Sequence, residues 1–227
     1  MTGERDAWLS RLDGSGAGEA VATIRSHPEW MRGEPPAALT RALRALTYDA
    51  ERPLLDLARD WERGPLVEAL WRELEGAETP AGRAHVAWLI KALPGKEVWE
   101  RAARAGTNPE EALPVRVFLL DALDRLAFAN AIGWHDLKTV IELCRTDSQP
   151  VIRERVPGML MSLPVSHEGT EVLLSMLEDE QTSVMTAALQ ALESLGVRTA
   201  DPRLARITAP PNESIRGRAK RIAATTG

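Results

Sequence analysis

Apolar residues recur along the chain at the spacing of an α-helix, most clearly over residues 178–196. Counted from Val184 as position zero, they fall at offsets 0, 4, 7, 8 and 11. These offsets share one face of a helix, whereas offsets 2, 6 and 9 point to the opposite face. The segment therefore predicts a helix with one buried side and one polar side.

The same template fits four other segments, so the pattern is an internal repeat. They begin at Gly82, Val115, Ile152 and Ile215, and successive templates are spaced by 33, 37, 32 and 31 residues. Of the 25 positions expected to be buried, all are apolar except Gly82 and Thr226, whereas only five of the 15 opposite positions are apolar. This contrast predicts one amphipathic helix in each of five units.

Each template leaves room before it for a shorter amphipathic helix, so every unit reads as an antiparallel helical hairpin. The shorter helices are expected at residues 65–74, 96–105, 134–145, 168–177 and 203–207. Turn residues separate the helices at Gly76, 94–95, 106–109, 147–150, Gly196 and 210–211. A hairpin of this size cannot bury its apolar face alone, so neighbouring hairpins must stack. Residues 51–227 are therefore expected to form one continuous all-α solenoid.

The N-terminal third of the chain follows the repeat less well. Helices are expected at 4–12, 17–26, 36–47 and 53–63, but their registers drift, and residues 13–18 (DGSGAG) read as a flexible joint. Terminal repeats of a solenoid are often atypical because one of their faces meets water. Residues 1–50 are interpreted as an irregular helical cap.

An arginine follows the first core position in four of the five units: Arg83, Arg116, Arg153 and Arg216. A turn with Asp, Asn or Pro, then Val or Ile, then Arg and an Ala/Leu-rich helix resembles the second helix of HEAT repeats. The resemblance covers roughly residues 64–225 and implies a right-handed α-α superhelix. In HEAT-like stacks such an arginine commonly bonds an acidic residue of the adjoining turn. The alternative is a basic ribbon that binds a phosphate polymer.

Composition supports a helical protein with an uneven charge. Leu and Ala dominate the apolar residues, while Phe and Tyr together number three. The net charge of −5 divides into +5 from Arg198 onward and −10 before it, and residues 165–197 hold six acidic residues without Lys or Arg. A single cysteine, a charged N-terminus and the lack of a long apolar run predict a cytoplasmic protein without a membrane span.

No motif in the chain identifies an enzyme, a cofactor site or a metal site. The four histidines lack a metal-binding spacing, and no phosphate loop, serine elbow or paired-cysteine site is present. Asp136 is interpreted as a helix cap and Cys144 as a buried, inert thiol. Most of the seven tryptophans are expected to fill gaps between helices.

The leading functional hypothesis is a non-enzymatic interaction module, a scaffold or adaptor that holds a protein or peptide on the inner face formed by the second helices. The outward positions carry more acid than base, which favours a partner with a basic patch. An exposed Trp88 would be a binding hot spot, although burial of its ring against the N-terminal hairpins is the competing interpretation. The proposed binding residues are Trp88, Lys91, Asp121, Asp124, Glu154, Gln190 and Glu193.

Two other hypotheses stay open. HEAT-like DNA glycosylases are solenoids of similar length, and Trp88, Asp121 and Arg116 would then act at a flipped base. The acidic body makes nucleic acid an unfavourable partner. Alternatively, the basic tail pairs with the acidic stretch 165–197, either of a second copy or within one chain.

Overall fold

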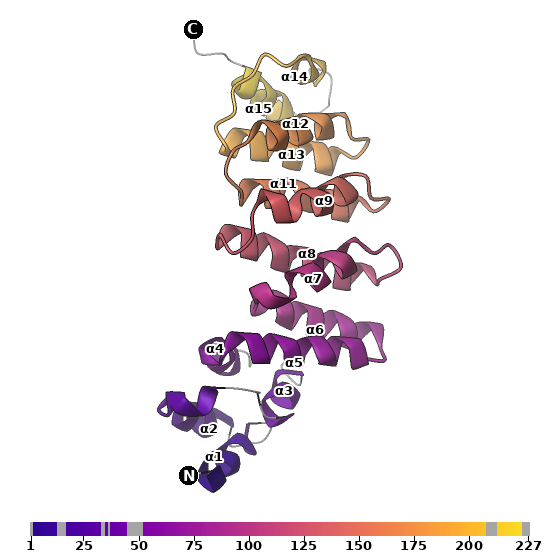
Figure 1. Cartoon of the computed structure of the whole chain (residues 1–227). Coiled ribbons are helices and arrows are strands. Elements are labelled where there is room, and N and C mark those ends of the chain that lie inside the picture. The colour runs from indigo at the N-terminus through magenta and orange to yellow at the C-terminus, as the bar shows by residue number, and fades with distance from the viewer. Residues whose placement is uncertain are drawn as a thin grey trace. The chain divides into compact units, whose positions relative to one another are not determined.

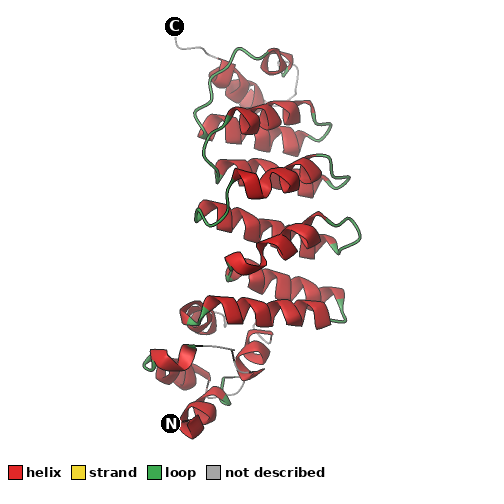
Figure 2. Cartoon of the chain, viewed as in Figure 1, coloured by secondary structure: helices red, strands yellow, loops and turns green. Residues whose placement is uncertain are grey.

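The computed structural model describes residues 2–12, 17–32, 35, 37–44, 52–207 and 213–223. These residues form helices joined by turns and contain no strand, so the predicted all-helical class is confirmed (Figure 2). None of the helices described is both long and apolar enough to cross a membrane. The chain divides into two compact units, Met1–Ala122 and Leu123–Gly227, with the boundary inside helix α8 (Leu113–Phe128). The cap predicted over residues 1–50 stays a prediction.

The N-terminal unit begins with short helices whose predicted places are confirmed. These are α1 (Thr2–Leu9), α2 (Ala17–Arg25), α3 (Ala37–Arg44) and α4 (Arg52–Asp60), with an unpredicted 3-10 turn, η1 (Pro28–Met31), after α2. Helix α1 packs on α2, and α4 packs on both α2 and α3. Residues 13–16 of the expected joint and 45–47 of the expected third helix lie outside the described residues.

A longer hairpin follows, formed by α5 (Arg63–Gly76) and α6 (Pro80–Ala92), which pack along one another. Helix α6 begins sharply because the Thr79 hydroxyl accepts the Gly82 N–H at 3.1 Å and Pro80 occupies the first turn. The turn η2 (Lys96–Val98), helix α7 (Trp99–Thr107) and the first part of α8 complete the unit.

The turn expected from residue 106 begins later, because α7 continues through Thr107. Gly106 is therefore a helical residue, and its role is close packing. A Cβ atom there would lie 3.1 Å from the Leu120 side chain of α8. Only glycine lets α7 approach α8 this closely without a shift of the neighbouring side chain.

In the C-terminal unit, each first helix packs on a second helix, and the second helices contact one another in series. Helix α9 packs on α11, α12 on α13 and α14 on α15, while α13 also contacts both α11 and α15 (Figure 1). The elements are α9 (Trp134–Arg145), α10 (Pro150–Arg153), α11 (Arg155–Met161), α12 (His167–Ser175), η3 (Met176–Glu178), α13 (Thr182–Ser194), α14 (Pro202–Arg206) and α15 (Glu213–Ala223).

The second helix that starts at Pro150 is interrupted at Glu154, which the repeat template did not predict. Pro157 explains the interruption, because proline has no N–H to donate to the carbonyl of Arg153 and its ring crowds that carbonyl. The helix resumes as α11, and Ile152 and Val156 on either side of the break are both fully buried. The break thus changes the backbone and keeps the register of the core.

Burial confirms the register of the repeat template. Of the 25 positions predicted to be buried, 24 are described and 21 are buried. Gly82 and Leu195 are half-buried, and Ala223 is exposed. None of the 14 described positions at offsets 2, 6 and 9 is buried. The tryptophans follow the same logic: Trp30, Trp61 and Trp71 are buried, and the other four are half-buried.

Substitutions on α13 test this register. Leu192 has no exposed surface, so Leu192→Ala is expected to lower the free energy of unfolding by about 3 kcal/mol through lost burial and a residual cavity. Gln190, two residues earlier on the exposed face, is the matched control, and Gln190→Ala should change stability by less than about 0.5 kcal/mol. Urea denaturation followed by circular dichroism measures both values. Equal effects of the two substitutions would contradict the register.

Candidate functional site

Arg153 is a buried arginine that ties three parts of the C-terminal unit together. Its Nε and Nη2 atoms donate to the two carboxylate oxygens of Asp179 at 2.7 and 2.9 Å, in the turn before α13. Its Nη1 donates to the Asp147 carbonyl oxygen at 2.8 Å, just after α9. The residue is only 7% exposed, so the fork-like pair with Asp179 is shielded from water.

Arg83 repeats this arrangement in the N-terminal unit. It forms a two-pronged ion pair with Glu111, in which Nε lies 3.2 Å from Oε1, and its Nη1 donates to the Leu74 carbonyl oxygen at 2.9 Å. Arg116, which is 2% exposed, donates from Nε to the Gly106 carbonyl oxygen at 3.1 Å. These arginines satisfy carbonyl groups at the ends of the preceding first helices, which lack partners within the helix.

The predicted bond between such an arginine and an acidic residue of the adjoining turn is therefore confirmed for Arg83 and Arg153. These two guanidinium groups and that of Arg116 are used inside the fold, so the structure does not support a phosphate-binding ribbon made of them. Arg216, the fourth arginine of the series, is exposed.

The pairs also shift the titration of their acids. The hydrogen bonds from Arg153 hold the pKa of Asp179 below its usual value, against an opposing effect of burial. For Glu111, burial by itself raises the pKa, but the bonds from Arg83 and from the Ala112 N–H outweigh it and leave the pKa lowered. Both carboxylates are therefore ionised over the physiological pH range.

The predicted binding residues of the N-terminal unit are Trp88, Lys91 and Asp121, and the structure joins two of them. Lys91 Nζ lies 2.7 Å from Asp121 Oδ2 and 5.4 Å from the centre of the Phe118 ring. Trp88 is half-buried, and its ring stands 5.5 Å from that of His85 in a tilted arrangement. The Trp88 ring thus has one side packed and part of its surface accessible.

The predicted binding residues of the C-terminal unit are Asp124, Glu154, Gln190 and Glu193. Asp124 accepts a hydrogen bond from the Ser162 hydroxyl at 2.6 Å, which connects α8 to the end of α11. Glu193 accepts from Arg218 at 2.8 Å and from Arg221 at 2.6 Å. Gln190 is exposed and Glu154 half-buried. The negative charge of Glu193 is thus neutralised by Arg218 and Arg221 of α15, which were not among the predicted binding residues.

The basic tail and the acidic stretch 165–197 meet within one chain, as the intramolecular alternative predicted. Besides the two arginines on Glu193, Arg203 pairs with Glu171 at 3.0 Å and Arg206 pairs with Glu178 at 3.0 Å. Arg203 also forms a two-pronged pair with Asp201, and this hydrogen bonding lowers the pKa of Asp201 to about 2. Most of the positive charge of the tail is therefore satisfied by neighbouring hairpins.

Two further interpretations of single residues are confirmed. Asp136 caps α9, because its Oδ2 accepts the Gly133 N–H at 2.8 Å. The Cys144 thiol forms no disulfide and has 1% of its surface exposed, which confirms that it is buried. Within the part of the chain that the structure describes, no group of three His, Cys, Asp or Glu residues is placed to hold a metal ion.

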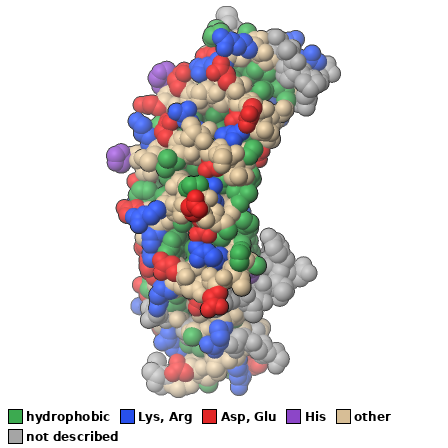
Figure 3. Space-filling view, turned by 90° about the vertical axis from the view of Figure 1, so that its right-hand side faces the viewer, with side chains coloured by type: hydrophobic (Ala, Val, Ile, Leu, Met, Phe, Trp, Pro, Cys, Tyr) green, Lys and Arg blue, Asp and Glu red, His purple; other side chains and the backbone are tan. Residues whose placement is uncertain are grey.

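Two surface features were missed by the sequence analysis. A hollow of about 520 Å³ lies between α14 and α15, with Arg216 and Lys220 among its lining residues. Phe128, at the end of α8, is 79% exposed, and a second hollow of about 390 Å³ begins at the neighbouring Ala127. On the face drawn in Figure 3, acidic and basic side chains are interspersed, without a large area of one sign.

Comparison with known proteins adds no name to this geometry. No family model matches the chain, and no curated protein shows a significant match to it.

Removing the buried carboxylate tests the role of the Arg153 pair. Asp179→Asn leaves the guanidinium without its counter-charge and is expected to lower the free energy of unfolding by roughly 3 kcal/mol. Glu180→Gln is the matched control, since Glu180 lies 3.8 Å from Arg153 but its side chain is 80% exposed. That substitution should change stability by less than about 0.5 kcal/mol. Urea unfolding at neutral pH separates the two, and equal losses would show that burial of the pair is unimportant.

The lowered pKa of Asp179 also predicts a pH dependence. A carboxylate whose pKa is lower in the folded than in the unfolded state adds stability above its unfolded pKa, about 3.9 for aspartate, and this is lost as pH falls through the folded pKa. The stability difference between the wild type and Asp179→Asn should therefore be full above about pH 5 and shrink below about pH 4. Urea midpoints from pH 7 to pH 3 measure it, and a pH-independent difference would contradict the assignment.

Proposed function

We propose that the hairpins stack as a right-handed HEAT-like α-solenoid and that the chain acts as a non-enzymatic scaffold or adaptor. Two observations support the stacking. Second helices contact one another in series in the C-terminal unit. Arg83 pairs with a carboxylate 28 residues further along the chain, and Arg153 pairs with one 26 residues further along. The same arginine–carboxylate link therefore occurs in both units. Links that repeat at the spacing of a hairpin are what a stack of similar hairpins requires.

The observation that carries the functional proposal is the accessibility of the outward face of the second helices. Its 14 described positions at offsets 2, 6 and 9 all keep some exposed surface, while the opposite positions form the core. A solenoid presents such a face as an extended concave surface for a partner. Trp88 is the strongest anchor on it, because an accessible aromatic ring supplies large contact area at low entropic cost.

The chemistry of the partner follows from the charges that stay available. Lys91 balances Asp121, and Arg218 and Arg221 balance Glu193, so the excess of acid rests on Asp124 and Glu154. A protein or peptide with an apolar anchor and a few basic residues is the proposed partner. The proposal also includes a cytoplasmic location, which the single buried cysteine supports.

The DNA-glycosylase alternative has less support. Of the three residues that it would use, Arg116 is buried and bonded to the Gly106 carbonyl oxygen, and Asp121 is paired with Lys91. Neither group is positioned to contact a phosphate or a flipped base.

Quantitative affinity capture from the native lysate with matched variants tests the binding face. Trp88→Ala is expected to reduce recovery of a direct partner by about tenfold or more, as truncation of an aromatic hot spot does. The double variant Lys91→Asp with Asp121→Lys keeps the ion pair but exchanges the two charges, and should weaken capture less than Trp88→Ala does. Arg104→Ala, at an exposed position of α7, is the control and should leave capture unchanged.

Circular dichroism and urea unfolding establish that each variant is folded before capture. If folded Trp88→Ala recovers the same proteins in the same amounts as the wild type and Arg104→Ala, the face assigned here does not bind the partner.

A further inference from the structure

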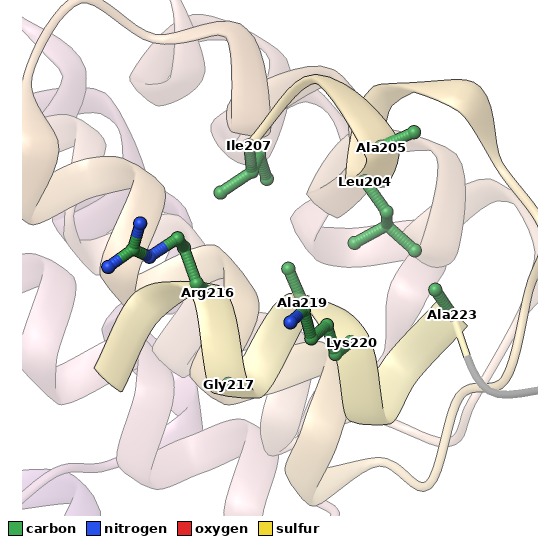
Figure 4. A pocket seen from close by; sticks show the side chains of 8 residues that line it. All are labelled: Leu204, Ala205, Ile207, Arg216, Gly217, Ala219, Lys220 and Ala223. Atoms are coloured by element: carbon green, nitrogen blue, oxygen red, sulfur yellow. The ribbon is translucent and has the colours of Figure 1, made fainter. Parts of the chain in front are cut away.

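The hollow between α14 and α15 combines an apolar floor with two cations. Six of its eight lining residues have no charge, and the charged ones are Arg216 and Lys220 (Figure 4). Leu204 and Ile207 extend from the α14 side toward α15, and Ala219 faces them. A concave site that is mostly apolar, with a few polar groups at its edge, is typical of a ligand-binding groove.

The hollow arises because α14 is too short to cover α15. With five residues α14 spans about 8 Å, whereas the 11 residues of α15 span about 17 Å. In the preceding hairpin, α12 and η3 together supply 12 residues against the 13 of α13. Ala223, which the repeat template places in the core, is consequently exposed and lines the hollow.

Among the described residues, the two cations of the hollow have no carboxylate partner, unlike four other arginines of the tail. Arg203, Arg206, Arg218 and Arg221 are each paired with a carboxylate of a neighbouring segment. Arg216 and Lys220 are exposed, stand four residues apart on one side of α15, and form no ion pair with any carboxylate among the described residues.

The position of Arg216 in the repeat indicates which group its side chain is suited to bind. It lies in the first turn of α15, where the helix dipole disfavours a cation, so electrostatics within the helix do not account for it. In the repeat it corresponds to Arg83 and Arg153, whose guanidinium groups bind the carboxylates of Glu111 and Asp179 from the turn within the next hairpin. Arg216 presents the same group without such a carboxylate.

We propose that this groove binds an acidic, amphipathic helix of a partner protein, with apolar side chains in the hollow and carboxylates on Arg216 and Lys220. The carboxylate takes the place that Glu111 and Asp179 take for the other two arginines, and the apolar side chains cover Ala219 and Ala223. Charge complementarity selects this occupant, because both rim charges are positive and none of the described residues that line the hollow is acidic. The site is independent of the second-helix face, since it uses neither Trp88 nor the other residues proposed there.

The test uses the full chain and a fluorescein-labelled amphipathic peptide of 15 residues, with leucines on one face and glutamates beside them. Fluorescence anisotropy is expected to show saturable binding. Arg216→Glu with Lys220→Glu should weaken it by about tenfold or more, because it places like charges against the peptide. Arg198→Glu, an exposed arginine outside the hollow, is the matched control and should have little effect. Trp88→Ala should also leave the affinity unchanged, which separates this site from the proposed function.

Two altered peptides test the charged contacts and the apolar contacts separately. Replacing glutamate by lysine, or leucine by alanine, should each abolish measurable binding. The proposal is overturned if the charge-reversed protein binds as tightly as the wild type, or if either altered peptide binds as tightly as the original.

Two further measurements would identify a different occupant of the groove. A concentration-dependent dimer in sedimentation velocity that the charge reversal dissolves would assign the groove to a second copy instead. Co-sedimentation with phosphatidylglycerol vesicles that depends on Arg216 and Lys220, without peptide binding, would assign it to an anionic membrane.

Discussion

A buried guanidinium group must have its charge and its N–H donors satisfied, and this requirement organises the hairpins of the chain. Arg153 meets it with the Asp179 carboxylate, from the turn within the next hairpin, and with a carbonyl from the turn just before its own helix. Removing water from such a charge without these partners would cost several kcal/mol. The acidic residue must therefore stand in a defined place one hairpin later, and the same demand recurs at Arg83. The repeat is thus held by chemistry at its turns as well as by the apolar faces of its helices.

A feature of the fold could be predicted from the sequence where its cause lies in residues close together along the chain. The core of the second helices follows from spacing alone, because apolar side chains at offsets 0, 4, 7, 8 and 11 have only one way to be buried together, and Leu119, Met159 and Leu192 are fully buried as predicted. The break at Glu154 was missed although its cause, Pro157, is visible in the sequence. Gly106 was assigned to a turn because glycine is ambiguous between chain reversal and close helix packing, and only the position of Leu120 decides between them.

The residues of the candidate binding face lie outside the core, and the count of their charges left out arginines of a neighbouring helix. Counting acids and bases on that face gave an acidic surface, whereas Glu193 is compensated by Arg218 and Arg221 from the next helix. A tally of one helix face cannot detect this, because long arginine side chains reach carboxylates 25 and 28 residues away. With much of the charge paired, selectivity on this face depends more on shape and on Trp88 than on net charge, since exposed, already paired ions contribute little to affinity.

The contacts at α15 show how a contact that stabilises the fold becomes a surface available to a partner. Arg83 and Arg153 each bind a carboxylate of the same chain, and the apolar faces of their helices bind apolar side chains. At α15 the template positions are the same, but the first helix is shortened to five residues. Ala223 meets solvent, and Arg216 forms no ion pair with a described carboxylate. Because the template positions of α15 are apolar as in the other second helices, a first helix of five residues leaves part of this face open as a groove.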